Sequence, residues 1–356
     1  MLSEHALAFL SRLLDTPGPS GFEGAAARVW REEASGFAAQ VIGDVHGNSH
    51  AVVNPDGSPT IMLAGHIDEI GLIVTYIDDQ GFVYVGPIGG WDVQVLVGQR
   101  IRFLGPTGDV FGVVGKKPAH LLKPDERKKA AELHDLWIDI GATSRQAAQQ
   151  MLRVGDAGVI DARVLRLPNN RLASRSIDDR IGAFVVLEAL RRYAAMPGAA
   201  RVVAVATTQE EIGYLGGGAL PGANRIDPAM AIAVDVTFAT DSPGVEKKEV
   251  GDCALGGGPV FARGSVISPV VFNLLVEAAR RLDLPYAVRA VGRSTSTDAD
   301  AIHIARKGVA TALVGIPNRY MHSPNEIVSL DDVDRTADVI AEACRLVTHE
   351  TDFSAR

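Results

Sequence analysis

The sequence predicts an α/β protein with a mostly parallel central sheet flanked by helices, and with a small β-rich insertion. After residue 165, strand-type runs and helical patterns alternate, as they do in parallel sheets whose two faces are covered. Residues 71–165 instead carry short strand signals rich in Val, Ile and Gly. Metal-binding side chains stand mostly at the ends of apolar runs between His66 and His322, and such run ends are where α/β sheets collect ligands.

Length and composition set the domain organisation. The 356 residues exceed one ordinary domain, so we predict a catalytic domain of residues 1–70 and 166–356 interrupted by a second domain at residues 71–165. Hydrophobic residues make up 47% and charged residues 22%, which is ordinary globular composition. A net charge of −8 without a basic stripe argues against a nucleic-acid surface.

The cysteines and the N-terminal segment indicate a location. Cys253 and Cys344 are the only cysteines in the sequence, too few for a disulfide framework and without metal-type spacing, which fits a reducing compartment. Residues 1–15 are amphipathic rather than basic-then-apolar, and no apolar run reaches the length of a membrane span. We therefore predict a cytoplasmic protein with no membrane partner.

The first half of the chain is expected to begin with helices and continue as short strands. Residues 3–14 have helical apolar spacing, and the Pro/Gly-rich segment at residues 17–21 separates them from a second helix at residues 23–35. Short strands around a Gly47-Asn48 turn follow in residues 39–53. Within the insertion, the sequence predicts strands at residues 72–77, 82–86, 99–103, 109–114 and 157–165, a helix entered through Pro124, and a helix at residues 144–151.

Four apolar runs define the expected core of the central sheet. They lie at residues 61–65, 201–207, 230–236 and 311–315. Helices are predicted at residues 179–193, 268–282, 299–307 and 330–350. Because the carboxyl ends of parallel strands meet at one edge of a sheet, the residues that follow these runs should lie close together.

His66 and Asp68 follow the first of these runs. Two residues apart on an extended segment, they lie on the same side of it. A histidine that binds metal usually donates its second ring N–H to a carboxylate, so Asp68 is a candidate to orient His66 rather than to bind metal itself. Taken alone, the pair is open to a structural role, and the remaining candidate groups favour the ligand role.

Two pairs of adjacent acidic residues indicate a metal site more strongly than His66 and Asp68 do. Asp178 and Asp179 open a helix, where capping and the helix dipole favour acids, but two adjacent carboxylates exceed what a cap requires, so one can bridge two ions. Glu210 and Glu211 follow a fully apolar strand and precede a Gly-rich turn at residues 216–218. There, one carboxylate can bind metal while its neighbour faces a bound water as general base.

Two more candidates complete the set. Asp235 interrupts an apolar run, where an unpaired charge costs roughly several kcal/mol, so a metal ion is the most economical partner, with an arginine as the alternative. His322 follows Ile316-Pro317 in a loop, where a surface histidine is the alternative. Two imidazoles and three carboxylates match the needs of a pair of divalent ions, so the sequence predicts a dinuclear metallohydrolase.

Two possible nucleophiles are set aside. Cys253 has no base near it in the sequence. The Ser/Thr-rich run at residues 294–298 lacks the Gly-x-Ser-x-Gly elbow and is predicted to be a loop lining the pocket.

Several stretches together resemble the tetrahedral aminopeptidases, the cobalt- or zinc-dependent group that includes glutamyl and deblocking aminopeptidases. The matching segments follow one another along nearly the whole chain, at residues 65–71, 89–92, 117–122, 138–142, 178–180, 209–213 and 320–324. Asp300 and the Ser/Thr-rich approach to Asp298 are more polar than the Gly-rich segment usual in that family, and this departure bears on substrate preference.

The resemblance implies a role for each candidate residue. Asp178 would bridge both ions and be joined to Asp179 by a cis peptide bond. The implied ligands are His66 and Asp235 for one ion, Glu211 and His322 for the other, and Asp178 for both. Glu210 would be the general base and acid, and Asp68 would orient His66. The resemblance also implies a zinc-peptidase-like catalytic domain. The β-rich insertion is similar to the PDZ-like dimerisation domain of the tetrahedral aminopeptidases, whose dimers assemble into a hollow twelve-subunit particle.

The leading hypothesis is therefore an aminopeptidase that cleaves peptides with two divalent ions, zinc or cobalt, although manganese suits the same donors. A related dinuclear amidohydrolase, a deacylase or carboxypeptidase acting on small N-acyl compounds, uses the same ligand set and is the alternative among enzymes. A metal-stabilised assembly or binding protein is the alternative outside enzymes. Substrates with free and blocked amines separate the first two, and a chelator test separates the third.

Overall fold

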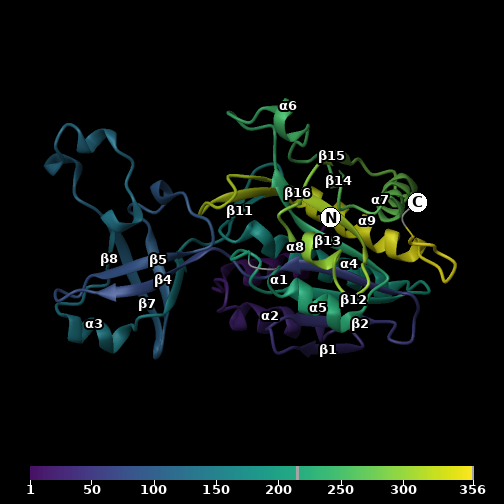
Figure 1. Cartoon of the computed structure of the whole chain (residues 1–356), viewed down its shortest axis with the longest axis horizontal. Coiled ribbons are helices and arrows are strands. Elements are labelled where there is room, and N and C mark those ends of the chain that lie inside the picture. Colours follow the sequence, from purple (N-terminus) through teal and green to yellow (C-terminus); the bar gives the residue numbers. More distant parts are fainter. Residues whose placement is uncertain (214–215, 355–356) are drawn as a thin grey trace.

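A computed structural model describes residues 1–213 and 216–354. Figure 1 shows two parts along the longest axis: a sheet covered by helices, and a smaller set of strands at one end. Both chain ends lie in the larger part (Figure 1), and the smaller part is built from the residues between β3 (Thr60–His66) and β10 (Leu165–Leu167). In the described part of the chain, no helix combines the length and the apolar character that a membrane span requires.

The larger part is built on an 11-stranded sheet of described residues. In addition to β3 and β10, its strands are β1 (Gln40–Gly43), β2 (Ser49–Val53), β11 (Arg171–Ser174), β12 (Arg201–Thr207), β13 (Met230–Phe238), β14 (Val260–Gly264), β15 (Ala287–Val291), β16 (Ala310–Arg319) and β17 (Glu326–Ser329). The order along the main path is β1-β2-β12-β3-β13-β16-β17-β11-β10, with β14 and β15 branching from β16.

The sheet is mixed, so the predicted mostly parallel arrangement is not confirmed. The four central strands, β12, β3, β13 and β16, are parallel. On both sides of them, β1, β2, β17, β11 and β10 join by antiparallel pairing. A short turn joins β10 and β11, and strands joined in this way pair antiparallel, whereas parallel neighbours need a crossover.

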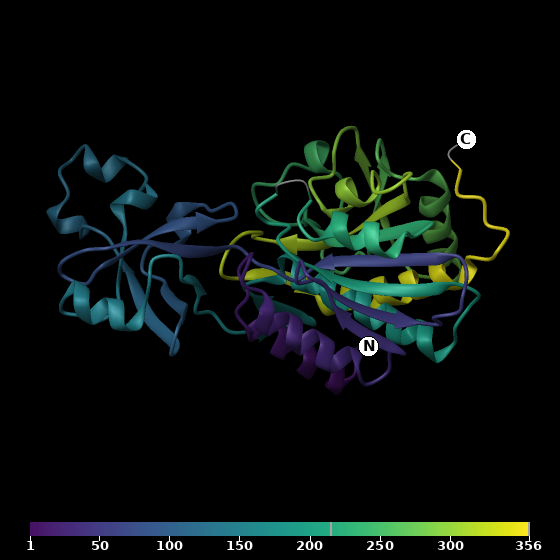
Figure 2. The same ribbon diagram turned by 60° about the horizontal axis from the view of Figure 1, so that its bottom comes forward.

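Alternating side chains of the central strands supply two cores. Ile61 and Leu63 of β3 pack with α1 (Glu4–Asp15), α2 (Gly24–Ala34), α4 (Ile177–Ala195), α7 (Pro269–Arg281) and α9 (Leu330–Leu346). Met62 and Ala64 face the opposite way and pack with α5 (Ala219–Ile226) and α8 (Asp298–Ile302). Helices therefore cover both faces of the sheet, and Figure 2 shows the purple N-terminal helices on one side of it.

The smaller part is a closed barrel of described strands in the order β4-β5-β8-β7-β6-β9. The strands are β4 (Gly71–Ile77), β5 (Val83–Ile88), β6 (Arg100–Gly105), β7 (Gly108–Gly115), β8 (Trp137–Asp139) and β9 (Ala157–Ile160), accompanied by α3 (Arg145–Met151). Phe103 and Ile101 belong to a hydrophobic core separate from those of the sheet.

Some predicted elements differ from the structure. The helix expected after Pro124 is absent, and this stretch forms only short 3₁₀ turns at Ala119–Leu121, Glu126–Lys128 and Leu133–Asp135. Residues 123–129 are mostly charged, and isolated short helices are marginal in water. The predicted strand at residues 157–165 ends at Ile160, and α8 ends at Ile302 rather than at residue 307. The predictions omitted the helices α5 and α6 (Lys247–Val250) and the strands β8, β10, β11, β14, β15 and β17.

Candidate metal centre

The carboxyl edge of the parallel strands brings the candidate ligands together. His66 ends β3, Asp235 lies near the end of β13, and Glu211 follows β12. His322 follows β16, and Asp178 lies at the start of α4, which packs across these strands. Possible ligand atoms of His66, Asp178 and Glu211 all lie within 4.8 Å of one another. The same holds for a second group, formed by His66, Asp179 and Asp235.

Asp178 lies between the two imidazoles. Its Oδ1 is 3.2 Å from Nε2 of His66, and its Oδ2 is 3.3 Å from Nε2 of His322. Oε2 of Glu211 is 3.4 Å from the same nitrogen of His322. Each oxygen of one carboxylate thus meets a different histidine, which is the arrangement that a carboxylate bridging two cations requires.

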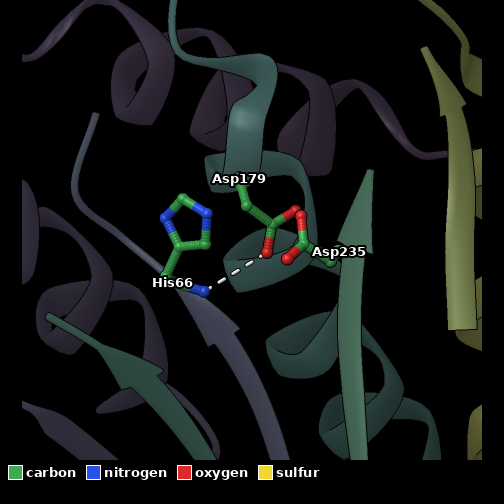
Figure 3. Close-up of side chains that lie close together, drawn as sticks. All are labelled: His66, Asp179 and Asp235. Atoms are coloured by element: carbon green, nitrogen blue, oxygen red, sulfur yellow. Dashed lines mark hydrogen bonds between the residues drawn. The ribbon is translucent and has the colours of Figure 1, made fainter. Parts of the chain in front are cut away.

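Asp179 and Asp235 form the other side of the centre. Figure 3 shows their carboxylates meeting beside the His66 ring, and the backbone N–H of His66 donates to Oδ2 of Asp179 at 3.2 Å. The peptide bond between Asp178 and Asp179 is cis. Burial raises the pKa of Asp179 and that of Asp235 well above the usual range, and the negative charges of neighbouring carboxylates add to the effect. A cation here would offset this concentration of buried negative charge.

Asp68 contacts His66 and the backbone of Glu210 and Glu211. Its Oδ1 is 3.4 Å from Nδ1 of His66 and accepts the backbone N–H of Glu210 at 3.2 Å, while its Oδ2 accepts the N–H of Glu211 at 3.1 Å. The hydroxyl of Ser20 donates to Oδ2 as well, at 2.6 Å. Burial opposes ionisation, but hydrogen bonds from His66 and Ser20 keep the pKa of Asp68 below its usual value. Asp68 therefore fixes the positions of three candidate residues at once.

Glu210 faces a cavity rather than the protein interior. The cavity has a volume of about 760 Å³, and Asp178, Asp235 and His322 are among the residues that line it. Burial raises the pKa of Glu210 to about 9, and the nearby carboxylates of Asp235 and Asp298 contribute to the rise. A carboxyl group with a raised pKa and access to a cavity can exchange protons near neutral pH.

The barrel contributes to the centre through His322. Nδ1 of His322 lies 2.9 Å from the carbonyl oxygen of Gly90, which belongs to the connection between β5 and β6. A carbonyl acceptor at Nδ1 fixes the ring so that Nε2 keeps its lone pair for a metal ion. The predicted alternative of a surface histidine does not describe this residue, because its ring is held on both sides.

Glu326 is a residue that the sequence analysis missed. It is 2% exposed, and its two oxygens accept the backbone N–H groups of Asp178 at 2.9 Å and His322 at 2.8 Å. It therefore anchors two candidate ligands through their backbone. A buried acid four residues after His322 was visible in the sequence, but its role depends on β17 lying next to the start of α4.

The residues present fit a pair of divalent ions. Oε1 of Glu211 is buried and has no hydrogen-bond partner among the described residues, so it is free to bind a cation. Imidazole and carboxylate are the donors that zinc, cobalt and manganese accept. The Ser/Thr-rich run lines the cavity through Ser294, Thr295, Ser296 and Thr297, as predicted. Asp298 is buried behind this run and accepts a hydrogen bond from Thr207.

Comparisons with known proteins show what the chain is similar to. Residues 47–339 match the model of the family described as M42 glutamyl aminopeptidase. The lysyl aminopeptidase of Pyrococcus furiosus is 36% identical over 335 residues, which cover 92% of this chain and 93% of that protein.

Solved structures of similar proteins share the whole fold. The TET aminopeptidase of the marine sediment archaeon Thaumarchaeota archaeon SCGC AB-539-E09 has a TM-score of 0.92 and 33% identity, with 98% of each chain covered. PhTET1-12s, a dodecamer in its asymmetric unit, has a TM-score of 0.84 and 28% identity, covering 97% of this chain and 100% of that one. The TET1 peptidase of Pyrococcus horikoshii, which can assemble into a tetrahedron or a large octahedral shell, has the same TM-score and 27% identity, covering 96% and 100%.

Proposed function

The chain belongs to the M42 glutamyl aminopeptidase family, and on this premise we propose that it removes N-terminal residues from peptides with two divalent ions and Glu210 as general base. It is a hydrolase and a metal-dependent aminopeptidase, as its relatives are named. The observation that supports the proposed site best is the position of Asp178, which lines the cavity and whose two oxygens face the imidazoles of His66 and His322.

Each ligand has a place in the proposal. Asp178 would hold both ions. His66 and Asp235 would complete the ligands of one ion, and Glu211 and His322 would complete those of the other. Zinc or cobalt is the proposed metal, and manganese suits the same donors.

Residues of the chain transfer the proton of the attacking water. When bound, the two ions lower the pKa of the attacking water and polarise the scissile carbonyl. Glu210 accepts the proton of that water and passes it to the departing amine. Asp68 holds the Glu210 backbone at 3.2 Å and faces the His66 ring at 3.4 Å, so the base and one ligand are fixed to the same carboxylate. This double contact supports Asp68 as the positioning residue of the site.

The proposal extends to assembly. Residues 71–165 form a PDZ-like dimerisation domain inserted into a catalytic domain of residues 1–70 and 166–356, and the dimers assemble into a particle of twelve chains. The dodecamer and the tetrahedron of the TET1 structures support this. Phe111 and Val113 are 56% and 49% exposed on β7, which supports a contact surface on the barrel. Analytical ultracentrifugation tests the mass of the assembly.

The proposed location is the cytoplasm, with peptides as substrates and neither nucleic acid nor membrane as a partner. Cys253 and Cys344 are both buried and unpaired, which supports a reducing compartment.

Matched peptides test the function. Hydrolysis of Ala-Ala-Ala and of its N-acetylated form should be compared in the metal-loaded protein, after chelation, and after zinc or cobalt is added back. We expect cleavage only of the free amine, loss of activity on chelation, and recovery with metal. Cleavage of the acetylated peptide alone would favour the amidohydrolase alternative.

A further inference from the structure

The cavity is lined by an arginine, Arg289, that has no ion-pair partner among the described residues. Arg289 lines the cavity from β15, beside Val260 and Ala262 of the neighbouring strand β14. In the part of the chain that the structure describes, no carboxylate oxygen lies within 4.0 Å of its guanidinium. Arg319 gives a contrast, since its guanidinium pairs with Asp241 at 2.7 Å.

The guanidinium of Arg289 is held in place by two contacts within the cavity wall. Its Nη1 donates to the hydroxyl of Thr237 at 2.7 Å, and its Cζ lies 5.9 Å from the centre of the Phe238 ring. Thr237 is two residues beyond Asp235 on β13, so both side chains point to the same face of the sheet. The charge is therefore fixed on the same wall of the cavity as a proposed metal ligand.

The charged residues that line the cavity fall into two groups, one acidic and one basic. The acidic residues lining it are Asp178, Glu210, Glu211 and Asp235, which all belong to the metal centre. Away from the centre, the charged lining residues are Arg289 and Arg293. Asp300, which follows the Ser/Thr-rich wall, does not line the cavity, because it accepts hydrogen bonds from Thr295 and Ser296 instead.

We propose that Arg289 is a specificity-determining residue that binds a carboxylate of the peptide substrate. This inference rests on the aminopeptidase function proposed above. A partly buried guanidinium that lacks a carboxylate partner recognises a planar carboxylate with two parallel hydrogen bonds. Two parts of a peptide carry this group: the side chain of an N-terminal Glu or Asp, and the free C-terminus of a short peptide.

The experiment compares kcat/KM within each variant for two matched substrate pairs. Glu-Ala-Ala-amide against Gln-Ala-Ala-amide isolates the side-chain carboxylate, and Ala-Ala-Ala against its amide isolates the C-terminal one. We expect the metal-loaded protein to favour the carboxylate member of one pair by about tenfold or more. Arg289→Met should bring that ratio close to one. Because both rates come from one preparation, partial loss of folded protein does not change the ratio.

Two other variants sharpen the result. Thr237→Val removes the hydroxyl that holds the guanidinium and should lower the same ratio in part. Arg263→Met is the matched control, because Arg263 lies on β14 next to the cavity strands but does not line the cavity, and it should leave the ratio unchanged.

The outcomes are separable. A fall in the first ratio assigns the carboxylate to the N-terminal side chain, and a fall in the second assigns it to the C-terminus. Equal ratios in the wild-type protein and Arg289→Met overturn the inference and leave Arg289 a structural residue stacked on Phe238. If no free-amine peptide is cleaved, the proposed function fails. Calorimetric binding of glutamate against glutamine and of Ala-Ala-Ala against its amide, with and without Arg289→Met, then still decides the role of Arg289.

Discussion

Asp178 lies between two histidines, and hydrogen bonds constrain both its backbone and its neighbour Asp179. Glu326 accepts its N–H, and the oxygens of Asp179 accept the N–H groups of His66 and Gly182 at 3.2 and 3.0 Å. Backbone contacts of this kind hold a side chain in one place without using its own oxygens. The carboxylate of Asp178 is therefore left free for cations.

The role of Glu210 is tested by Glu210→Gln. An amide cannot accept the proton of the attacking water, so we expect kcat to fall by about 10²–10⁴-fold while the metal content stays the same. Steady-state kinetics with metal analysis checks both parts. Glu277→Gln, on the exposed side of α7 beside Arg281, is the control and should retain full activity. Retained activity in Glu210→Gln would refute the role of general base.

Glu326→Gln tests the anchoring of the ligands. The amide NH₂ of the new side chain faces one of the two N–H donors, of Asp178 or His322, and leaves it without an acceptor. We expect the affinity for zinc to fall by about 10–100-fold. Competition with a chromogenic chelator measures this, and the exposed Glu246→Gln is the control. An unchanged affinity would show that the backbone of the ligands needs no such anchor.

At the residue scale, the sequence predicted candidate ligands that follow strands. It missed the groups that position those ligands through backbone hydrogen bonds. His66 and Glu211 were visible because a polar group directly after an apolar run is rare. Glu326 and the carbonyl of Gly90 were not, because a contact between β17 and α4, or between the barrel and a loop of the sheet, is set by tertiary structure.

At the scale of elements, the close approach of α4 to β3 places Asp178 and Asp179 over the end of the strand. Gly65 permits this approach, since a Cβ atom there would overlap the backbone of Gly182 and Ala183. Gly182 in turn leaves room for the Asp179 carboxylate. The position of the site thus depends on two glycines that face each other across the helix–sheet contact.

Gly65→Ala should therefore destabilise the protein. We expect the free energy of unfolding to fall by about 1–3 kcal/mol, since backbone atoms must move apart to accept the methyl group. Urea denaturation measures the change. Gly24→Ala is the matched control, because nothing lies within 4 Å of the added Cβ at the start of α2, and it should be neutral or slightly stabilising. Equal stability of the two variants would contradict this account of the contact.

Elements with one dominant period were predictable, and edge elements were not. The four central strands carry long apolar runs and stand out from the sequence. Strands β14 and β15 were missed because they are partly exposed, with β15 alternating between half-buried and exposed residues. The antiparallel margins of the sheet were missed because hydrophobic period and composition predict where a strand lies, but not which strand it pairs with.

At the scale of the whole molecule, the metal centre gathers more negative than positive charge. In the metal-free protein the pKa of Glu210 is about 9, against 4.5 for the free side chain. The folded state then holds this proton more tightly than the unfolded chain does, so the free energy of unfolding falls as pH rises from 4.5 towards 9. Bound cations offset this loss by pairing with the ionised carboxylates.

Metal removal should therefore lower the stability of the protein more at higher pH. We expect the difference in Tm between the metal-loaded and the chelator-treated protein to grow from about pH 5 to about pH 8, because protons compete with metal for the same carboxylates and imidazoles at the lower pH. Differential scanning calorimetry at constant ionic strength checks the trend. A difference that is constant or shrinks over this range would contradict it.

The two-part organisation was visible as a change in composition, whereas the contact between the parts was not. The barrel reaches the centre through the connection between β5 and β6, which supplies the carbonyl of Gly90 to His322. A sequence pattern can mark a module, but it does not show which loop of that module returns to the site.

The central claim is that residues remote in the sequence hold two cations on either side of Asp178. Anomalous diffraction from crystals soaked in zinc tests it most directly. We predict two peaks flanking the Asp178 carboxylate, one beside His66 and Asp235 and the other beside Glu211 and His322. A single peak, or peaks that do not contact Asp178, would contradict the account.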